Sequence, residues 1–253
     1  MSLADGIEVF VLAAPGRDLA HQRMRASLAA SDIGTDYHWC EHPPGIPVLQ
    51  HWSETLLRAA ASTAPQVIVL EDDCLVNRHL IHNVRQWAWP DDPRFGAGWL
   101  YNPGGYCAGE DVWYQEATPW YGTVAVLYWT ADLANIRRGA LRWMRDQGNL
   151  RSWDCAVSWA VSRLGLSIRA HGPPLVEHLH EVPSALGHHH GWSFGTTRGT
   201  FQVDWKPVGC VRAVHTREHP RPVDAAPPER RKVTDAPWLY VDSDPPLWEP
   251  AVK

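Results

Sequence analysis

Three consecutive carboxylates, Glu71, Asp72 and Asp73, have the clearest chemical potential in this chain of 253 residues. They directly follow the apolar run 67–70 (VIVL). Adjacent carboxylates repel one another, so the cluster is costly unless a cation or hydrogen-bond donors compensate it. Mg²⁺ and Mn²⁺ are natural compensators because they prefer oxygen ligands and keep positions open for phosphates. The motif indicates a metal site able to neutralise a departing diphosphate. The alternative is a solvated acidic turn before a helix.

Strand and helix patterns alternate around this motif. Apolar runs predict strands over 7–13, 37–40, 67–70, 98–101, 123–129 and 166–170. Apolar residues at helical spacing predict helices over 18–30, 52–61, 80–89, 133–144 and 154–164. The alternation predicts an α/β fold with a mostly parallel central sheet flanked by helices. Ligands in such folds bind at the carboxyl ends of strands, which is where the acidic cluster lies.

Composition and charge exclude several classes of protein. The net charge of -5 argues against nucleic acid as the main partner. Five cysteines without a CxxC pair argue against a disulfide framework or a cysteine zinc site. The glycine-rich dinucleotide and P-loop motifs do not occur in the sequence. No apolar run is long enough to span a membrane, and the first residues lack the basic start of a secretory signal, so we expect a cytoplasmic protein.

The segment VIVLEDDCLVN resembles the metal-binding segment of GT-A-fold glycosyltransferases, in which an apolar strand ends in a DxD-type or EDD motif. The opening IEVFVLAAPGRDLAHQRMRASL is similar to the first strand, arginine-bearing turn and helix of their nucleotide-sugar-binding half. Later, SWDCAVSWAVSRLGLSI and PPLVEHLHEVPSALGH resemble their acceptor-side helix and closing segment. The resemblance covers roughly residues 7–190, and the EDD segment is its most specific part.

The resemblance implies donor-side roles for five residues. Asp73 would bind the metal directly, and Asp72 would face the donor sugar or the water shell of the metal. Glu71 would reach ribose or sugar hydroxyls. Arg17 would contact the nucleotide or its phosphates, and Glu41 would accept a hydrogen bond from the base.

The resemblance also implies a base and a histidine ligand. Asp154 would be the general base that deprotonates the acceptor hydroxyl in an inverting transfer, although an ordinary helix cap is the alternative for this residue. His178 would complete the metal site, with His180 as the alternative; their spacing also permits a separate zinc site. The histidines 188–190 lie in a glycine-flanked segment that could close over the diphosphate. We expect 102–119 to be a long loop rich in glycine and aromatic residues on the acceptor side. The aromatic residues in or beside it could face sugar rings or simply pack the loop onto the sheet, namely Trp99, Tyr101, Tyr106, Trp113, Tyr114, Trp120 and Tyr121.

Taken together, these features predict a metal-dependent glycosyltransferase. It would move a sugar from a nucleotide-sugar donor, most simply a UDP-sugar, to an acceptor hydroxyl with inversion, and retention stays open. Mn²⁺ or Mg²⁺ would be the cofactor, and a glycan, a small molecule or a protein would be the acceptor. Two alternatives remain: a metal-dependent nucleotidyltransferase or phosphohydrolase, and a carbohydrate-binding protein without turnover.

The expected organisation is one catalytic domain with an extension. The GT-A-like domain would span 1–195, divided into a nucleotide-sugar-binding half, 1–90, and an acceptor half, 91–195. Residues 196–253 would form a C-terminal tail that is rich in proline. The sequence leaves the oligomeric state open.

Overall fold

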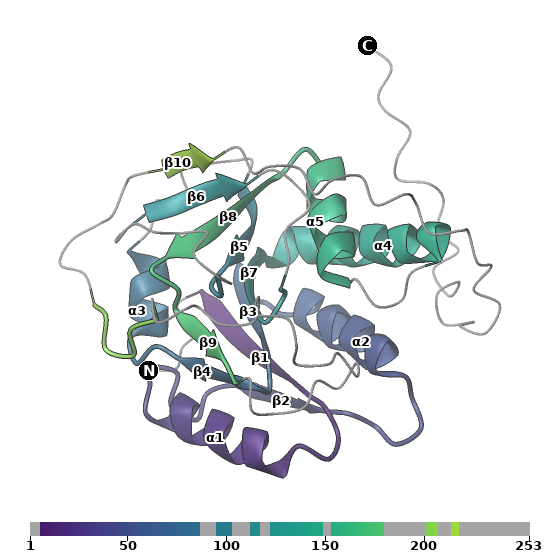
Figure 1. Ribbon diagram of the computed structural model, residues 1–253. Coiled ribbons are helices and arrows are strands. Elements are labelled where there is room, and N and C mark those ends of the chain that lie inside the picture. Colours follow the sequence, from purple (N-terminus) through teal and green to yellow (C-terminus); the bar gives the residue numbers. More distant parts are fainter. Residues whose placement is uncertain are drawn as a thin grey trace.

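An eight-stranded sheet with helices on both faces organises the computed structural model (Figure 1). The structure describes residues 6–86, 95–102, 122–148, 153–179 and 201–206, and the backbone alone of 112–116 and 214–217. The strand order is β10-β6-β8-β5-β7-β3-β1-β2. These strands are β1 (Ile7–Ala13), β2 (His38–Glu41), β3 (Gln66–Glu71), β5 (Phe95–Trp99), β6 (Val112–Glu116), β7 (Ala125–Trp129), β8 (Ser167–Gly172) and β10 (Val214–Arg217).

The sheet is mostly parallel, as the sequence predicts. Strand β1 pairs in parallel with β2 and β3, β5 pairs in parallel with β8, and β10 pairs in parallel with β6. Strand β7 runs antiparallel between β3 and β5, and β6 is antiparallel to β8. A separate ribbon joins β4 (Cys74–Val76) to β9 (Val176–His178) in antiparallel register. This α/β architecture confirms the expected fold class.

Two apolar cores lie on opposite faces of the sheet. Helices α1 (Asp18–Ala29) and α3 (Leu80–Arg85) cover one face, and α2 (Val48–Ala60), α4 (Thr130–Gln147) and α5 (Trp153–Arg163) cover the other (Figure 1). Successive strand residues point to opposite faces. On β1, Val9 and Val11 therefore enter the α1 core while Phe10 and Leu12 enter the α2 core. Burial on both sides explains the unbroken apolar runs of the inner strands.

The prediction of a loop over 102–119 is wrong for residues 112–116. Residues 112–116 form β6, which pairs with β8 on one side and β10 on the other. The sequence VWYQE is rich in residues that favour strands. The surrounding glycines obscured this short strand, and its pairing partners are distant in sequence. The remaining residues of the expected loop, 103–111 and 117–119, lie outside the described residues.

Part of the expected C-terminal tail contacts the sheet domain. The buried side-chain amide of Asn77 donates hydrogen bonds to the carbonyls of Gln202 (2.7 Å) and Trp205 (3.1 Å). Strand β10 also comes from this extension. The proline-rich residues 219–250 lie outside the described residues.

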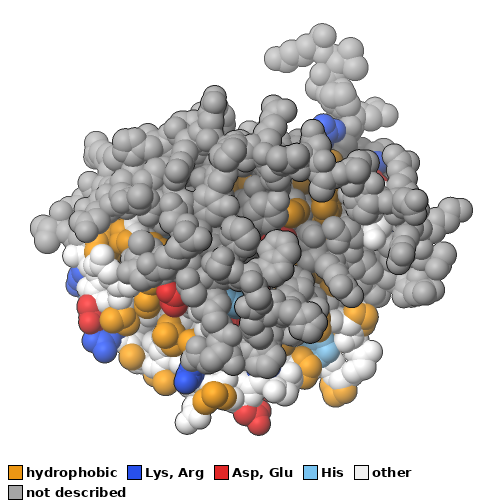
Figure 2. Space-filling view, viewed as in Figure 1, with side chains coloured by type: hydrophobic (Ala, Val, Ile, Leu, Met, Phe, Trp, Pro, Cys, Tyr) orange, Lys and Arg blue, Asp and Glu red, His pale blue; other side chains and the backbone are white. Residues whose placement is uncertain are grey.

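The described helices and the face shown in Figure 2 were predicted to be free of membrane spans and of a dominant basic patch, respectively, and two observations bear on this. Among the helices that the structure describes, none has the length and apolar character needed to cross a membrane. On the face shown in Figure 2, the described Lys and Arg side chains are scattered among acidic and apolar ones. This distribution agrees with the acidic net charge of the chain.

Candidate active site

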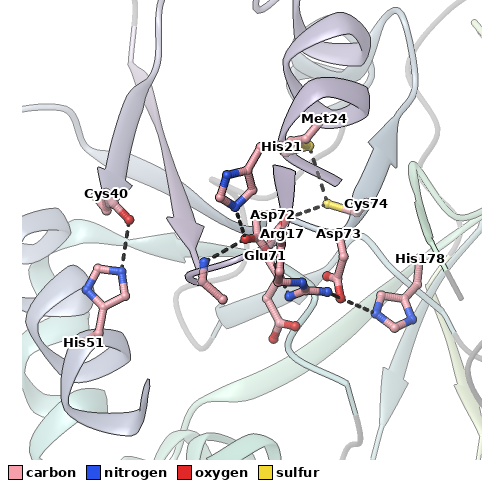
Figure 3. A network of polar contacts seen from close by, with 11 residues as sticks. Arg17, His21, Met24, Cys40, His51, Glu71, Asp72, Asp73, Cys74 and His178 are labelled. Atoms are coloured by element: carbon pink, nitrogen blue, oxygen red, sulfur yellow. Dashed lines mark hydrogen bonds and ion pairs between the residues drawn. The ribbon is translucent and has the colours of Figure 1, made fainter. Parts of the chain in front are cut away.

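The acidic cluster lies at the carboxyl edge of the sheet, beside the end of β1. Glu71 is the last residue of β3 and is paired with Leu12 of β1. The next residue of β1, Ala13, pairs with Glu41 at the end of β2. Because three parallel strands end together, the turn that follows β1 and the residues after β3 converge. Arg17, predicted to serve the same ligand as the cluster, is thereby brought onto it (Figure 3).

Asp72 is buried, and both of its carboxylate oxygens are engaged. Oδ2 accepts a hydrogen bond from the Ala14 backbone N–H (2.7 Å) and lies 2.7 Å from His21 Nε2. Oδ1 accepts a hydrogen bond from Arg17 Nη1 at 2.7 Å. Burial raises the pKa of Asp72 even though Arg17 opposes that shift. In this arrangement Asp72 holds the turn after β1 and the start of α1 against the end of β3.

Asp73 has a different environment, because only one of its two carboxylate oxygens contacts described donors. Its Oδ2 bonds to Arg17 Nη2 and lies 3.0 Å from His178 Nε2. Its Oδ1 is buried and accepts no hydrogen bond from the residues that the structure describes. Burial alone would raise the pKa of Asp73, but the hydrogen bond and charge of His178, together with Arg17, lower it to about 2. Asp73 is therefore an ionised carboxylate with capacity for another ligand.

His178 reaches Asp73 because β4 and β9 pair directly after the acidic cluster. Their register sets Cys74 opposite His178, and the backbone N–H of Leu179 donates to the Asp73 carbonyl at 2.6 Å. Burial disfavours the charged imidazole, but the hydrogen bond and charge of Asp73 outweigh burial and raise the pKa of His178. The structure thus brings together Arg17, Asp72, Asp73 and His178, all of which the sequence analysis assigned to one site.

Glu71 and Asp154 are attached to the same short segment before β7. The Thr123 hydroxyl donates to Glu71 Oε1 at 3.4 Å, and the Glu71 backbone N–H donates to the Val124 carbonyl at 2.8 Å. The backbone N–H of Gly122, the residue before Thr123, donates to Asp154 Oδ2 at 3.0 Å. Three residues of extended chain span at most about 10 Å. The expected base and the acidic cluster are therefore neighbours across this segment.

Burial governs the acid–base properties of both carboxyl groups on this segment. Burial, followed by the charge of Asp73, raises the pKa of Glu71 to about 8. Burial also raises the pKa of Asp154, although backbone N–H donors of Gly122 and Cys155 oppose that shift. Asp154 lies in the first turn of α5, and its Oδ1 accepts from the Cys155 N–H at 2.8 Å. A position at the start of a helix and a role as general base are therefore compatible for Asp154.

The remaining predicted residues lie elsewhere. Glu41 is exposed at the end of β2, and β1 lies between it and Glu71. Trp99 and Tyr101, expected near an acceptor, are buried in the two cores. The other predicted histidines and aromatic residues lie beyond the residues whose side chains are described, namely His180, 188–190, Tyr106, Trp113, Tyr114, Trp120 and Tyr121.

Sequence reasoning missed His21, Gly122 and Thr123. His21 follows Arg17 by four residues, which is one helical turn, so this spacing was a usable signal. It lies against Asp72 and makes an edge contact with Trp39, with ring centroids 5.1 Å apart. No comparable signal marks Gly122 and Thr123, because their contacts depend on how β7 enters the sheet.

The donor set fits a divalent ion that shares its coordination with a ligand. Asp73 supplies a buried carboxylate oxygen without a hydrogen-bond donor, and the His178 imidazole lies beside it. Within the described ranges, no three His, Cys, Asp or Glu side chains are grouped so as to enclose a metal. Mg²⁺-type ions are commonly held by one or two protein carboxylates, with phosphates and water as the other ligands. Asp73 and His178 are the residues that would hold such an ion.

Comparisons with known proteins concern the fold. No protein-family model matches the sequence, and no curated protein matches it. Among solved structures, the chain is similar to a glycosyltransferase involved in the glycosylation of the major capsid of PBCV-1, with 13% identity and a TM-score of 0.44 over 66% of this chain and 82% of that chain. It is also similar to the glycosyltransferase GlyE of Streptococcus pneumoniae, with 10% identity and a TM-score of 0.44 over 69% and 54% of the two chains.

A nucleotidyltransferase is also among the similar structures. The 2-C-methyl-D-erythritol 4-phosphate cytidylyltransferase of Thermus thermophilus matches with 17% identity and a TM-score of 0.36, over 72% of this chain and 91% of that chain. The chemistry of the site has to be argued from its own residues.

Proposed function

We propose that this protein is a metal-dependent glycosyltransferase that moves a sugar from a nucleotide-sugar donor to an acceptor hydroxyl, with inversion. One observation carries the proposal: the segment 122–124 binds the acidic cluster through Glu71 and the expected base through Asp154. An inverting transfer needs both features, a site for the anionic leaving group and a carboxylate near the acceptor. A UDP-sugar is the simplest donor consistent with the family resemblance of the sequence.

Residues on one side of this segment would bind the donor, and Asp154 on the other side would activate the acceptor. On the donor side, Arg17 offers a guanidinium suited to bidentate contact with phosphate oxygens. Asp73 and His178 would hold Mn²⁺ or Mg²⁺, which when bound supplies Lewis-acid neutralisation of the diphosphate leaving group. On the acceptor side, Asp154 accepts the proton of the attacking hydroxyl, and the Gly122 N–H fixes the orientation of its carboxylate.

The raised pKa of Asp154 suits this assignment. Burial raises the pKa of this carboxyl, so it is a stronger base than an exposed aspartate. The two backbone N–H donors hold its oxygens while leaving a second lone pair on each for an acceptor hydroxyl. The acceptor could be a glycan, a small molecule or a protein, since its contacts would come from residues beyond the described site.

Thermal stabilisation by nucleotides tests the proposal. UDP, GDP, CMP and dTDP would each be added with and without Mn²⁺ while the unfolding temperature is followed. A ligand held at 100 times its Kd adds about 2.7 kcal/mol to the free energy of unfolding. For a domain of this size, that corresponds to a shift of roughly 5–10 °C.

The expected result is a Mn²⁺-dependent shift with one nucleoside diphosphate, which Asp73→Asn removes. Asp204→Asn is the matched control, because Asp204 forms an exposed ion pair with Arg78 outside the site. Stabilisation by no nucleotide under either condition contradicts the transferase proposal and favours a carbohydrate-binding protein. In a second series with UTP and CTP, stabilisation by a triphosphate but not by its diphosphate favours a nucleotidyltransferase.

A further inference from the structure

A single arginine bridges the two aspartates of the acidic cluster. Arg17 Nη1 donates to Asp72 Oδ1 at 2.7 Å, and Nη2 donates to Asp73 Oδ2 (Figure 3). All three side chains are at least nine-tenths buried. Charge-assisted hydrogen bonds of this kind are about twice as strong as neutral ones. The guanidinium and the His178 imidazole therefore together supply the positive charge that offsets the cluster in this structure.

The two ends of this bridge are not equivalent. Asp72 is held independently of Arg17, because Ala14 and His21 both contact its Oδ2. Asp73 has only its Oδ2 in use, and its buried Oδ1 accepts no hydrogen bond within the described structure. The buried Arg17 Nε likewise donates to no described acceptor. The carboxylate oxygen that can still accept a ligand thus belongs to Asp73 and not to Asp72.

We propose that Arg17 is a resident cation that competes with the divalent ion for Asp73. In the free protein, Arg17 occupies Asp73 and keeps the affinity for the metal low. A nucleoside diphosphate offers the guanidinium a second anionic partner, so Arg17 pivots about its Asp72 contact and leaves Asp73 to the ion. This inference rests on the proposed function and adds a coupling between donor and metal that is carried by one side chain.

Electrostatics supports an exchange rather than joint occupancy. Arg17 stays cationic, because the charges of Asp73 and Asp72 raise its pKa despite the opposing effect of burial. A guanidinium and a dication on the same carboxylate repel each other strongly where water is largely excluded. A diphosphate carries paired oxygens that match the planar fork of arginine. By linkage, the nucleotide and the metal must then strengthen each other's binding by the same factor.

The test is a titration of the free protein with Mn²⁺, in which the electron paramagnetic resonance signal reports the unbound ion. The wild type, Arg17→Gln and Arg25→Gln would each be titrated with Mn²⁺ alone and with Mn²⁺ plus UDP, GDP, CMP or dTDP. Arg25 is the matched control, since it lies on α1, which Arg17 directly precedes, and stacks over Trp39, 3.7 Å from its centroid. A double variant, Arg17→Gln with Asp73→Asn, verifies that any gained binding is at Asp73.

We expect Arg17→Gln to bind Mn²⁺ without nucleotide about 10-fold more tightly than the wild type, which is a typical allosteric coupling. Arg25→Gln should match the wild type, and the double variant should lose the gain. UDP should increase the Mn²⁺ affinity of the wild type and have a smaller effect in Arg17→Gln. If Arg17→Gln does not fold, Arg17→Lys retains one charge without the bridging fork and should show a smaller gain.

Two results would overturn the inference in distinguishable ways. If the wild type binds Mn²⁺ with UDP but Arg17→Gln and Arg17→Lys gain nothing without it, Arg17 does not compete and the transferase proposal survives. If no protein binds Mn²⁺ with or without any of the four nucleotides, the metal-dependent function fails and the competition fails with it.

Discussion

Glu71 and Asp154 belong to different elements, yet both are bound to consecutive residues of one segment. Thr123 donates its hydroxyl to Glu71 (3.4 Å), and Gly122 donates its backbone N–H to Asp154 (3.0 Å). Glu71 ends β3, and Asp154 lies in the first turn of α5, much later in the chain. A displacement of this segment would change the hydrogen bonds of both carboxyl groups. The link between the acidic cluster and the expected base is therefore structural as well as chemical.

Asp154→Asn tests the role of this base. The amide cannot take a proton from an acceptor hydroxyl, so transfer should fall by about 10²–10⁴-fold, while the nucleotide still binds. Calorimetric binding of the nucleoside diphosphate and a transfer assay measure the two properties separately. Asp132→Asn is the control, because Asp132 also lies in the first turn of a helix, α4. Full transfer activity in Asp154→Asn would show that the base is another group.

The pH dependence of transfer provides a second test of Asp154. Burial raises the pKa of this carboxyl, and only the ionised form can accept a proton. The transfer rate should therefore fall as the pH drops through a pKa above the usual aspartate range of about 4. The profile of kcat against pH measures this limb. A rate that stays constant down to pH 4 would contradict the assignment.

Gly122→Ala tests the segment that joins the two carboxyl groups. Gly122 has φ +87°, and an added Cβ would lie 3.0 Å from Tyr101 Cε1. We expect a loss of about 1–3 kcal/mol in the free energy of unfolding, because a side chain is strained at this φ. The shifted N–H should also misalign Asp154 and lower kcat, with nucleotide binding retained.

Gly34→Ala separates the backbone cost of that change from its effect on the site. Gly34 has φ +63°, and an added Cβ would meet no atom within 4 Å. This control should lose stability through the backbone alone and keep the wild-type kcat. If Gly122→Ala keeps the wild-type kcat as well, the segment does not position the base.

His171 predicts an acid-dependent loss of stability away from the site. Its imidazole is fully buried against Trp205, and burial lowers its pKa from 6.5 to about 3. Between these values the unfolded chain binds a proton that the folded chain does not. The free energy of unfolding therefore falls as the pH drops, by up to about 1.4 kcal/mol per pH unit from this group.

His171→Asn should reduce that slope. Asparagine can keep a donor toward the Pro173 carbonyl that His171 Nδ1 contacts, but it does not titrate. Denaturant unfolding at several pH values between 3 and 7 measures the effect, and His38→Asn, which removes an exposed histidine, is the control. An unchanged slope in His171→Asn would mean that His171 is not kept neutral in the folded protein.

The sequence predicted the central strands well because burial on both faces leaves a simple pattern. The strand expected over 7–13 matches β1, and the one expected over 67–70 is extended by one residue at each end in β3. Arg17 was expected at the nucleotide from the family resemblance, and in the structure the parallel arrangement of these strands brings it beside the carboxylates. The different environments of the two aspartates could not be predicted from the sequence. Asp72 is held by Ala14 and His21, while Asp73 keeps one carboxylate oxygen without a described hydrogen-bond donor.

Short and distant pairings were beyond sequence reasoning. Strand β4 has three residues, too few for a periodic pattern, yet its register with β9 brings His178 to Asp73. The residue was expected at the metal site from the family resemblance alone. Strand β6 was missed for a related reason, since its partners β8 and β10 come from much later in the chain.

Crystals grown with Mn²⁺ and the nucleoside diphosphate that stabilises the protein most would test the central claim directly. Anomalous diffraction locates manganese independently of the model of the protein. We predict a manganese peak about 2.0–2.2 Å from an Asp73 carboxylate oxygen and from His178 Nε2, the distances usual for such metal ligands. The diphosphate should complete the coordination, with Asp154 on the acceptor side of segment 122–124. A nucleotide bound elsewhere, or manganese that contacts neither Asp73 nor His178, would contradict the account.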